Sequence, residues 1–295
     1  MKLSIATGSM ADFENTKFRH FDLTLGGIFV GPYLNEKFDE CVEGVKATCA
    51  RLGADIPQAH APYALNPCKD KETMENQIKV MEKILLACGK LGVDRITLHS
   101  GFGFSENKEE MMRKNVEYYK RLIPMAEENN VTLMIENISE EIYHDRFVIE
   151  TADDILDLRD RLGNHRLIGA CWDSGHANTK ALDQYENITK LKGILKGVHL
   201  HDNHGDTDDH LPPMIGTVNF DDVINALLDI NYDGAFNLES HIFGGGWPNY
   251  RRKQSQFNPA EARLFTPDET LRHYGYDFMY GVGEHLMKKY NIEVE

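Results

Sequence analysis

The chain has few cysteines and no pattern that would pair them. Its 295 residues include five cysteines, an odd number, and no Cys-x-x-Cys pair occurs. This excludes a disulfide framework and is typical of a reduced compartment. The chain also lacks an apolar run near Met1 that would mark a signal peptide, and no run approaches the ~20 residues of a membrane-spanning helix. We therefore expect a cytoplasmic protein with no membrane partner.

Basic residues are scarce as well. Lysine and arginine together number 32, against 47 aspartates and glutamates, and the net charge is −15. An acidic surface disfavours contact with nucleic acid or anionic membranes, although a local basic groove is not excluded. A Gly-rich phosphate fingerprint after the first expected strand is also missing, which argues against a nucleotide-binding open sheet.

What the chain does contain is a regular alternation of short apolar runs and helical patterns. Eight runs are expected strands: Lys2–Thr7, His20–Leu25, Asp55–His60, Asp94–His99, Val131–Glu136, Leu167–Asp173, Lys196–His201 and Gly234–Glu239. Segments with 3.6-residue periodicity lie between most of them, namely Lys37–Leu52, Lys71–Leu91, Lys108–Asn129, Thr151–Leu162 and Phe220–Ile230, and a last helix is expected at Pro267–Tyr290. This predicts an α/β fold, a single-domain (β/α)8 TIM barrel over residues 1–295, with a doubly wound open sheet as the runner-up. The weakest unit is the first, because Gly8–Arg19 shows no clear helix.

Four consecutive expected strands end in an acidic or imidazole residue. These are Glu136, Asp173, His199 and Glu239. In a parallel barrel such strand ends converge on one face, where three carboxylates and an imidazole predict a divalent-metal site. The oxygen-rich set favours Mn²⁺, with Co²⁺, Mg²⁺ or Zn²⁺ as alternatives.

Further side chains at neighbouring positions are candidates for substrate contact or additional metal binding. They are His60, His99, His176, His201, Asp208 and His210. A single histidine at a strand end is more often a hydrogen-bonded structural residue. If several of these ligate, the site becomes nitrogen-rich, can hold more than one ion, and favours Zn²⁺.

Glu136 and Glu239 are also the candidate catalytic pair. They end the fifth and eighth strands, so they can approach a substrate from opposite sides. A metal that bridges a sugar carbonyl and the adjacent hydroxyl makes the C–H bond between them more acidic. One carboxylate then removes the proton, the other returns one, and the metal stabilises the enediolate.

Two connections on the same face are longer than a barrel requires. They lie near residues 202–218 and 242–266. Long loops there cover substrate or form subunit contacts. In the second loop, Trp247 is a candidate to close over a sugar ring or to pack against the barrel rim. Arg251 belongs to a basic run that is either a solvated patch or a phosphate contact. A homo-oligomer is an open alternative, by analogy with other barrels.

These motifs resemble the xylose isomerase-like TIM-barrel superfamily over roughly Ile56 to Glu239. It contains sugar and sugar phosphate isomerases and epimerases, and the AP endonuclease family 2 that includes endonuclease IV. Its ketose 3-epimerases hold one metal with a Glu, an Asp, a His and a Glu, and the two Glu transfer protons. The resemblance assigns these roles to Glu136, Asp173, a strand-seven histidine and Glu239. The strand-seven ligand is His199 if HLxD is matched and His201 if HxH is matched, and we favour His199.

Endonuclease IV is the main alternative, and its three-zinc set can be filled in order. The matching residues are His60, His99, Glu136, Asp173, His176, His199, Asp208, His210 and Glu239. The segments after Glu136 and His176 depart from the DNA-repair pattern, however. The loop HDNHGDTDDHLPP is acidic where a DNA-binding protein needs positive charge.

The resulting expectation is a metal-dependent sugar or sugar phosphate isomerase or epimerase that acts on a small carbohydrate. Within the Asp173-Ser-Gly-His176 motif, the resemblance implies that His176 contacts substrate. The first alternative is a three-zinc phosphodiesterase acting on abasic DNA. The second is a metal-dependent lyase or dehydratase acting on a polyol or glycoside. A non-catalytic carbohydrate-binding role is the remaining possibility.

Overall fold

The strands form one parallel sheet that curls into a barrel. The computed structural model describes residues 1–14, 16–63, 66–102, 107–139, 149–240 and 268–294. The strand order is β7-β6-β5-β4-β3-β2-β1-β8. The strands are β1 (Lys2–Thr7), β2 (His20–Thr24), β3 (Asp55–His60), β4 (Arg95–Leu98), β5 (Thr132–Glu136), β6 (Ile168–Asp173), β7 (Leu195–His199) and β8 (Ala235–Leu238).

The two edge strands of this sheet meet just beyond β7. The backbone nitrogen of Leu200 donates to the carbonyl of Asn237 at 2.9 Å, and the nitrogen of Glu239 donates to the carbonyl of Leu200 at 3.0 Å. These bonds join β7 to β8 and bring the barrel to closure. The predicted TIM barrel is therefore confirmed, and the open-sheet alternative is wrong.

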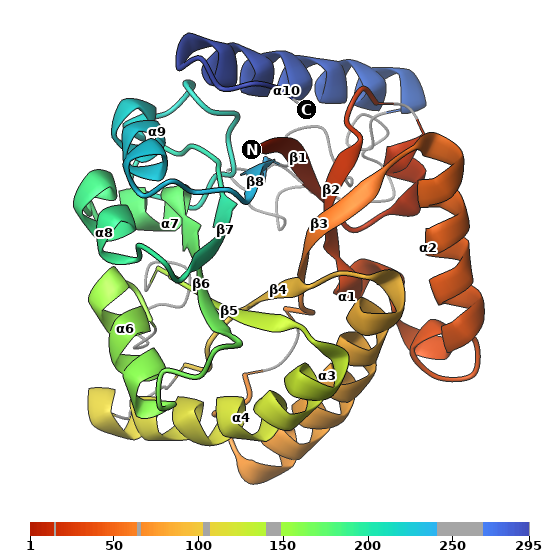
Figure 1. Ribbon diagram of the computed structural model, residues 1–295, viewed down its shortest axis with the longest axis vertical. Coiled ribbons are helices and arrows are strands. Elements are labelled where there is room, and N and C mark those ends of the chain that lie inside the picture. Colours follow the sequence, from red (N-terminus) through yellow and green to blue (C-terminus); the bar gives the residue numbers. More distant parts are fainter. Residues whose placement is uncertain (15, 64–65, 103–106, 140–148, 241–267, 295) are drawn as a thin grey trace, which may run out of the picture.

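Helices surround the strands on the outside (Figure 1). They are α2 (Phe38–Leu52), α3 (Lys71–Leu91), α4 (Lys108–Asn129), α6 (Ala152–Arg161), α8 (Gln184–Lys190), α9 (Phe220–Asp229) and α10 (Glu269–Lys289), with the short α1 (Leu25–Ile28) and α7 (Ser174–Thr179) at strand ends. In the first unit, for which no clear helix was predicted, the described residues form the 3-10 turn η1 (Met10–Phe13), and a second turn, η2 (Gly31–Leu34), precedes α2. None of the helices in the described residues is long and apolar enough to cross a membrane.

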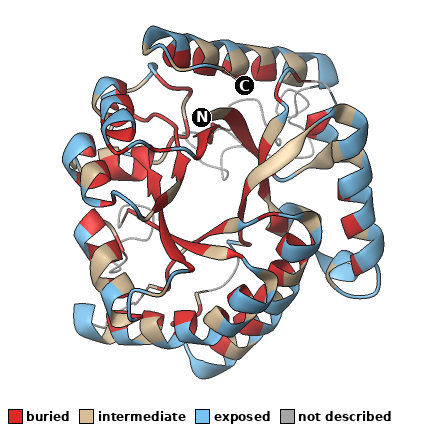
Figure 2. Cartoon of the chain, in the orientation of Figure 1, coloured by how far each residue is buried: buried red, intermediate tan, exposed pale blue. Residues whose placement is uncertain are grey.

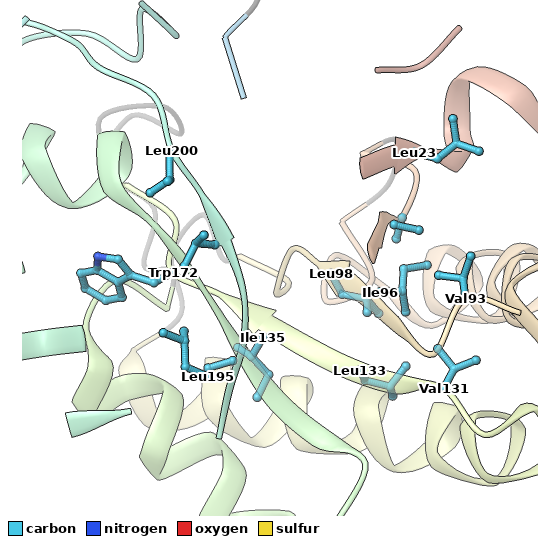
Figure 3. Packing of buried hydrophobic residues seen from close by; sticks show 14 of the residues in the cluster. Leu23, Val93, Ile96, Leu98, Val131, Leu133, Ile135, Trp172, Leu195 and Leu200 are labelled. Carbon is cyan, nitrogen blue, oxygen red and sulfur yellow. The ribbon is translucent and has the colours of Figure 1, made fainter. Parts of the chain in front are cut away.

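Alternation along each strand separates the core from the site. In β5, Leu133 and Ile135 belong to the buried hydrophobic cluster between strands and helices (Figure 3). Because successive side chains of a strand point to opposite faces, Met134 and Glu136 point into the barrel. Burying each Leu or Ile stabilises the fold by roughly 1.5–3 kcal/mol. The helices are buried on the side facing the strands and exposed on the other (Figure 2), so the apolar core fixes which strand residues face inward.

The connection after β7 is tied to the barrel by a buried carboxylate. Asp202 accepts hydrogen bonds from the backbone nitrogens of Val218 at 2.9 Å and Gly216 at 2.8 Å. Gly216 is required here, because a Cβ atom would lie 2.1 Å from the carbonyl oxygen of Asn203. The second long loop, with the candidates Trp247 and Arg251, lies outside the described residues.

Candidate functional site

Four donors from consecutive strands meet at the C-terminal end of the barrel. Glu136, Asp173 and His199 are the last residues of β5, β6 and β7, and Glu239 directly follows β8. One donor atom from each lies within 4.8 Å of those from the others, and all four residues are buried. We call these four residues the central group. The structure thus brings together the residues that the strand ends predicted, while their role as ligands stays a prediction.

His199 contacts both glutamates of the central group. Its Nδ1 lies 2.5 Å from Glu136 Oε1 and 3.3 Å from Glu239 Oε2. The same nitrogen is 4.0 Å from Asp173 Oδ2. His199, and not His201, is therefore the strand-seven histidine that lies within the central group, as the HLxD match favours.

Charge in the central group is balanced between His199 and Glu136. Burial by itself raises the pKa of Glu136, but the imidazoles of His199 and His99 bring it well below its ordinary value. For His199 burial acts in the opposite direction, and acidic neighbours, among them Glu239 and Glu136, raise its pKa well above the ordinary value. Without metal, a proton on His199 thus offsets the carboxylates. A metal ion would take over this role, because a ligating imidazole must be neutral.

Two more predicted histidines flank the central group through Glu136. His60 Nε2 lies 3.4 Å and His99 Nε2 lies 3.1 Å from Glu136 Oε2. His60, Glu136 and His199 also form a set that can hold an ion. The ring of Tyr63 lies 4.5 Å from that of His60, and its hydroxyl donates to Glu239 Oε1 at 3.5 Å. Both oxygens of Glu136 are therefore occupied by imidazoles.

The remaining candidates form a second set beside the first. We call His176, His201, Asp208 and His210 the loop group, because most of it comes from the segment after β7. Its donor atoms also lie within 4.8 Å of one another. Around the carboxylate of Asp208, His210 Nε2 lies at 3.0 Å, His176 Nε2 at 3.5 Å and His201 Nε2 at 3.7 Å. This set is nitrogen-rich where the central group is oxygen-rich.

Backbone carbonyls orient two of these imidazoles. His176 Nδ1 donates to the carbonyl of Asn137 at 2.8 Å, and His210 Nδ1 donates to the carbonyl of Glu239 at 2.7 Å. A carbonyl only accepts, so Nδ1 carries the hydrogen and Nε2 is left to face Asp208. This arrangement is the usual support of metal-binding histidines. Both groups therefore fit a divalent cation.

His201 has a different place from the other three. Its Nε2 lies 3.1 Å from Asp173, and its ring stacks on that of His210 with centroids 3.9 Å apart and planes 8° from parallel. A ring nitrogen binds an ion in the plane of its ring, so two parallel stacked rings do not aim at one point. Gly175 permits this position, because a Cβ there would lie 1.9 Å from the His201 ring. His201 therefore contacts Asp173, and the other three residues are the better candidates for loop ligands.

Two residues near the central group were missed in the sequence. Asn137 holds Asp173 in place: its Oδ1 accepts from the Asp173 nitrogen at 2.7 Å, and its Nδ2 donates to the Asp173 carbonyl at 2.9 Å. Asp22 lies 3.1 Å from His199 Nε2. An acidic residue at the centre of the run HFDLT, with the inward-facing parity, is a signal that would have pointed to Asp22.

Comparison with known proteins places the chain in a family. Residues 15–258 match the family described as xylose isomerase-like TIM barrel. The chain belongs to this family. Among curated relatives, the uncharacterized protein MJ1311 of Methanocaldococcus jannaschii is 28% identical over 190 residues. These are 61% of this chain and 63% of that protein. A probable endonuclease 4 of Acholeplasma laidlawii is 24% identical over 211 residues, 66% of this chain and 69% of that protein.

Epimerases are found among both relatives and solved structures. D-psicose 3-epimerase of Enterocloster bolteae is 25% identical over 145 residues, 49% of this chain and 45% of that enzyme. The crystal structure of D-psicose 3-epimerase with D-tagatose from Clostridium cellulolyticum superimposes with a TM-score of 0.73, covering 97% of this chain and 99% of that one. At 16% identity, this likeness shows the fold alone.

Proposed function

We propose that the protein is a divalent-metal-dependent enzyme that isomerises or epimerises a sugar or sugar phosphate. The observation that carries this proposal is the central group, in which two glutamates from separate strands face one histidine within 4.8 Å. A divalent cation bound there supplies Lewis acidity that makes a C–H bond beside a carbonyl easier to ionise. The epimerases among the relatives support the same substrate class.

In this proposal the two glutamates have unequal tasks. Glu136 has both oxygens in contact with imidazoles, and its pKa is held well below the ordinary value. Such a carboxylate is a weak base and a good ligand. Oε2 of Glu239 lies 3.3 Å from His199 Nδ1, and its Oε1 accepts a hydrogen bond from the Tyr63 hydroxyl at 3.5 Å. We assign the first proton removal to Glu239, and the return of a proton on the other side to Glu136, which would first receive that proton from one of the imidazoles that contact it.

Deuterium incorporation tests this assignment. The protein, loaded with Mn²⁺, is incubated in D₂O with a panel of ketoses, aldoses and their phosphates, and deuterium next to the carbonyl is measured by NMR. We expect incorporation that disappears after chelation and in Glu239→Gln, and that persists in the control Glu127→Gln, which changes an exposed glutamate at the end of α4. Full incorporation by chelated protein, or none with any sugar, would contradict the proposal. Loss of water or of an aglycone would instead favour the lyase alternative.

A second candidate function has its own observation in its favour. The loop group adds two nitrogen donors, His176 and His210, beside the central group, and His60 and His99 add two more at Glu136. A multi-ion, nitrogen-rich site suits zinc-dependent phosphodiester cleavage, and an endonuclease 4 is among the relatives. Cleavage of an oligonucleotide with one abasic site, in the presence of Zn²⁺ and at several salt concentrations, tests it. If the oligonucleotide is cleaved and no sugar incorporates deuterium, this second function replaces the first proposal.

A further inference from the structure

A buried aspartate lies inside the barrel beneath the central group. Asp22 is in the middle of β2, and its neighbours Phe21 and Leu23 belong to the outer hydrophobic cluster. Asp22 therefore points inward, and it is fully buried. Its Oδ2 lies 3.1 Å from His199 Nε2. Asp22 belongs to none of the donor sets that can hold a metal ion among the described residues.

Two amides fix the carboxylate of Asp22 without neutralising it. Gln58 Nε2 donates to Asp22 Oδ2 at 2.7 Å, and Asn237 Nδ2 donates to the same oxygen at 3.0 Å. Neither amide can carry a charge. The other oxygen, Oδ1, has no hydrogen-bond partner in the described part of the chain. A buried carboxylate needs a positive or strongly donating partner, and His199 is the ionisable group that touches it.

The two nitrogens of His199 therefore face different surroundings. Nε2 faces Asp22 Oδ2, which already accepts from two amides, while Nδ1 faces the carboxylates of Glu136 and Glu239 at 2.5 and 3.3 Å. We propose that Asp22 is a positioning residue that holds the hydrogen of His199 on Nε2 and so presents the Nδ1 lone pair to the cation of the central group. This inference rests on the proposed function only in that the central group binds a cation.

The consequence is a measurable contribution to metal binding. A carboxylate behind a ligating imidazole fixes the ring and raises its basicity, and removing it typically costs 10–100-fold in metal affinity. Asp22→Asn keeps the shape but removes the charge. Because both amides and His199 meet Oδ2, the asparagine oxygen can take that place, with its nitrogen at the place of Oδ1, which has no partner among the described residues. We expect the affinity for Mn²⁺ to fall by roughly 10–100-fold. Asp22→Ser, a smaller side chain with a hydroxyl acceptor, is the second variant if the asparagine variant does not fold.

Two measurements on purified protein test the inference. The first is a Mn²⁺ titration in which free ion is counted by electron paramagnetic resonance. The second is ¹⁵N NMR of histidine-labelled, zinc-loaded protein, in which we expect a slowly exchanging Nε2–H of His199 that exchanges faster in the Asp22 variants. The matched control is Asp154→Asn, another buried aspartate, which accepts from Thr151 at 2.8 Å and Lys108 at 2.6 Å. The control should leave both readouts unchanged.

The outcomes separate this inference from the proposed function. If folded Asp22→Asn binds Mn²⁺ as tightly as the unchanged protein and keeps the Nε2–H signal, Asp22 has no positioning role and the inference is overturned. If the unchanged protein binds Mn²⁺ and loses 10-fold or more of its affinity in the variant, but exchanges no sugar proton, the inference stands and the proposed function fails. Failure of the unchanged protein to bind a cation at the central group overturns both.

Discussion

The central group and the loop group lie side by side but are built in different ways. The central group consists of β5, β6 and β7 end residues and the residue after β8, with three carboxylates and one imidazole. The loop group draws Asp208 and His210 from a connection without regular structure, and it has three imidazoles and one carboxylate. The first is fixed by the barrel itself, and the second by the hydrogen bonds of a loop.

Under the proposed function, this difference divides proton transfer at the central group from structural support at the loop group. Strand ends in a closed barrel are rigid, which suits residues that must move a proton over a fixed distance. The loop donors depend on Asp202 and on backbone carbonyls, and His210 itself has a positive φ of 47°. We therefore expect the ion of the central group to be the one required for proton transfer, and the loop group to bind zinc without taking part in that transfer.

The largest effect is expected when a glutamate of the central group is replaced by glutamine. Glu239→Gln removes the proposed base. General-base catalysis contributes typically 10²–10⁴-fold, so the rate of deuterium incorporation into the sugar should fall by roughly 10³-fold. His176→Gln, the matched change in the loop group, should reduce the same rate by less than about 10-fold. Rates of deuterium incorporation at saturating Mn²⁺ check both. Equal losses in the two variants would remove the distinction between the groups.

The next largest effect is expected from removing Asp202, the carboxylate that ties the connection after β7 to the barrel. Asp202→Ala leaves the backbone nitrogens of Gly216 and Val218 without their acceptor, and each unsatisfied buried group costs about 1–3 kcal/mol. We expect unfolding at lower denaturant, loss of about one zinc per chain, and retention of the Mn²⁺ of the central group. Elemental analysis beside a urea titration measures all three. If Mn²⁺ is lost together with zinc, the two groups are not independent.

Stability of the metal-free protein should depend on pH in opposite directions for the two groups. Burial lowers the pKa of His210, but attraction to Asp208 and the hydrogen bond that His210 donates to this carboxylate raise the pKa to about 9, above the ordinary 6.5. Its contribution is therefore complete below the ordinary value and is lost as the pH rises toward about 9. The pKa of Glu136 lies well below its ordinary 4.5, so its contribution is present above that value and is lost in acid.

Thermal unfolding of chelated protein between about pH 3 and pH 10 checks this expectation. His210→Gln should reduce the loss of thermal stability at alkaline pH and leave the loss of stability in acid unchanged. Loading with zinc should also remove the alkaline decline, because a ligating imidazole carries no extra proton. A decline of equal depth in the unchanged protein and in His210→Gln would show that the loop group does not titrate in this way.

The smallest effect concerns strain in the loop. Met214 has a φ of 75° and is half exposed, whereas no residue of the central group, all of which are described, has a positive φ. A left-handed conformation costs a residue with a side chain about 1 kcal/mol or more, and glycine avoids this cost. We expect Met214→Gly to raise the unfolding free energy by roughly 0.5–1 kcal/mol, as measured by urea titration. A decrease would mean that the strain at Met214 is smaller than the freedom that glycine adds to the unfolded chain.

The same comparison explains what the sequence could predict. Each central residue ends an apolar run, and strand parity decides its direction, so the eight strands and the placement of Glu136, Asp173, His199 and Glu239 followed from local pattern. The roles of Asn137 and Asp22 did not, because both act through contacts between strands. The separation of His201 from the other loop histidines depends on ring stacking against His210, which no spacing in the sequence expresses.

Anomalous diffraction from crystals grown with Mn²⁺, recorded at the manganese edge, tests the central claim most directly. The account predicts a manganese peak within ligand distance of Glu136 and Glu239, next to His199 Nδ1 and with Asp22 behind the same ring. A peak beside Asp208 alone, with the central group empty, would contradict it.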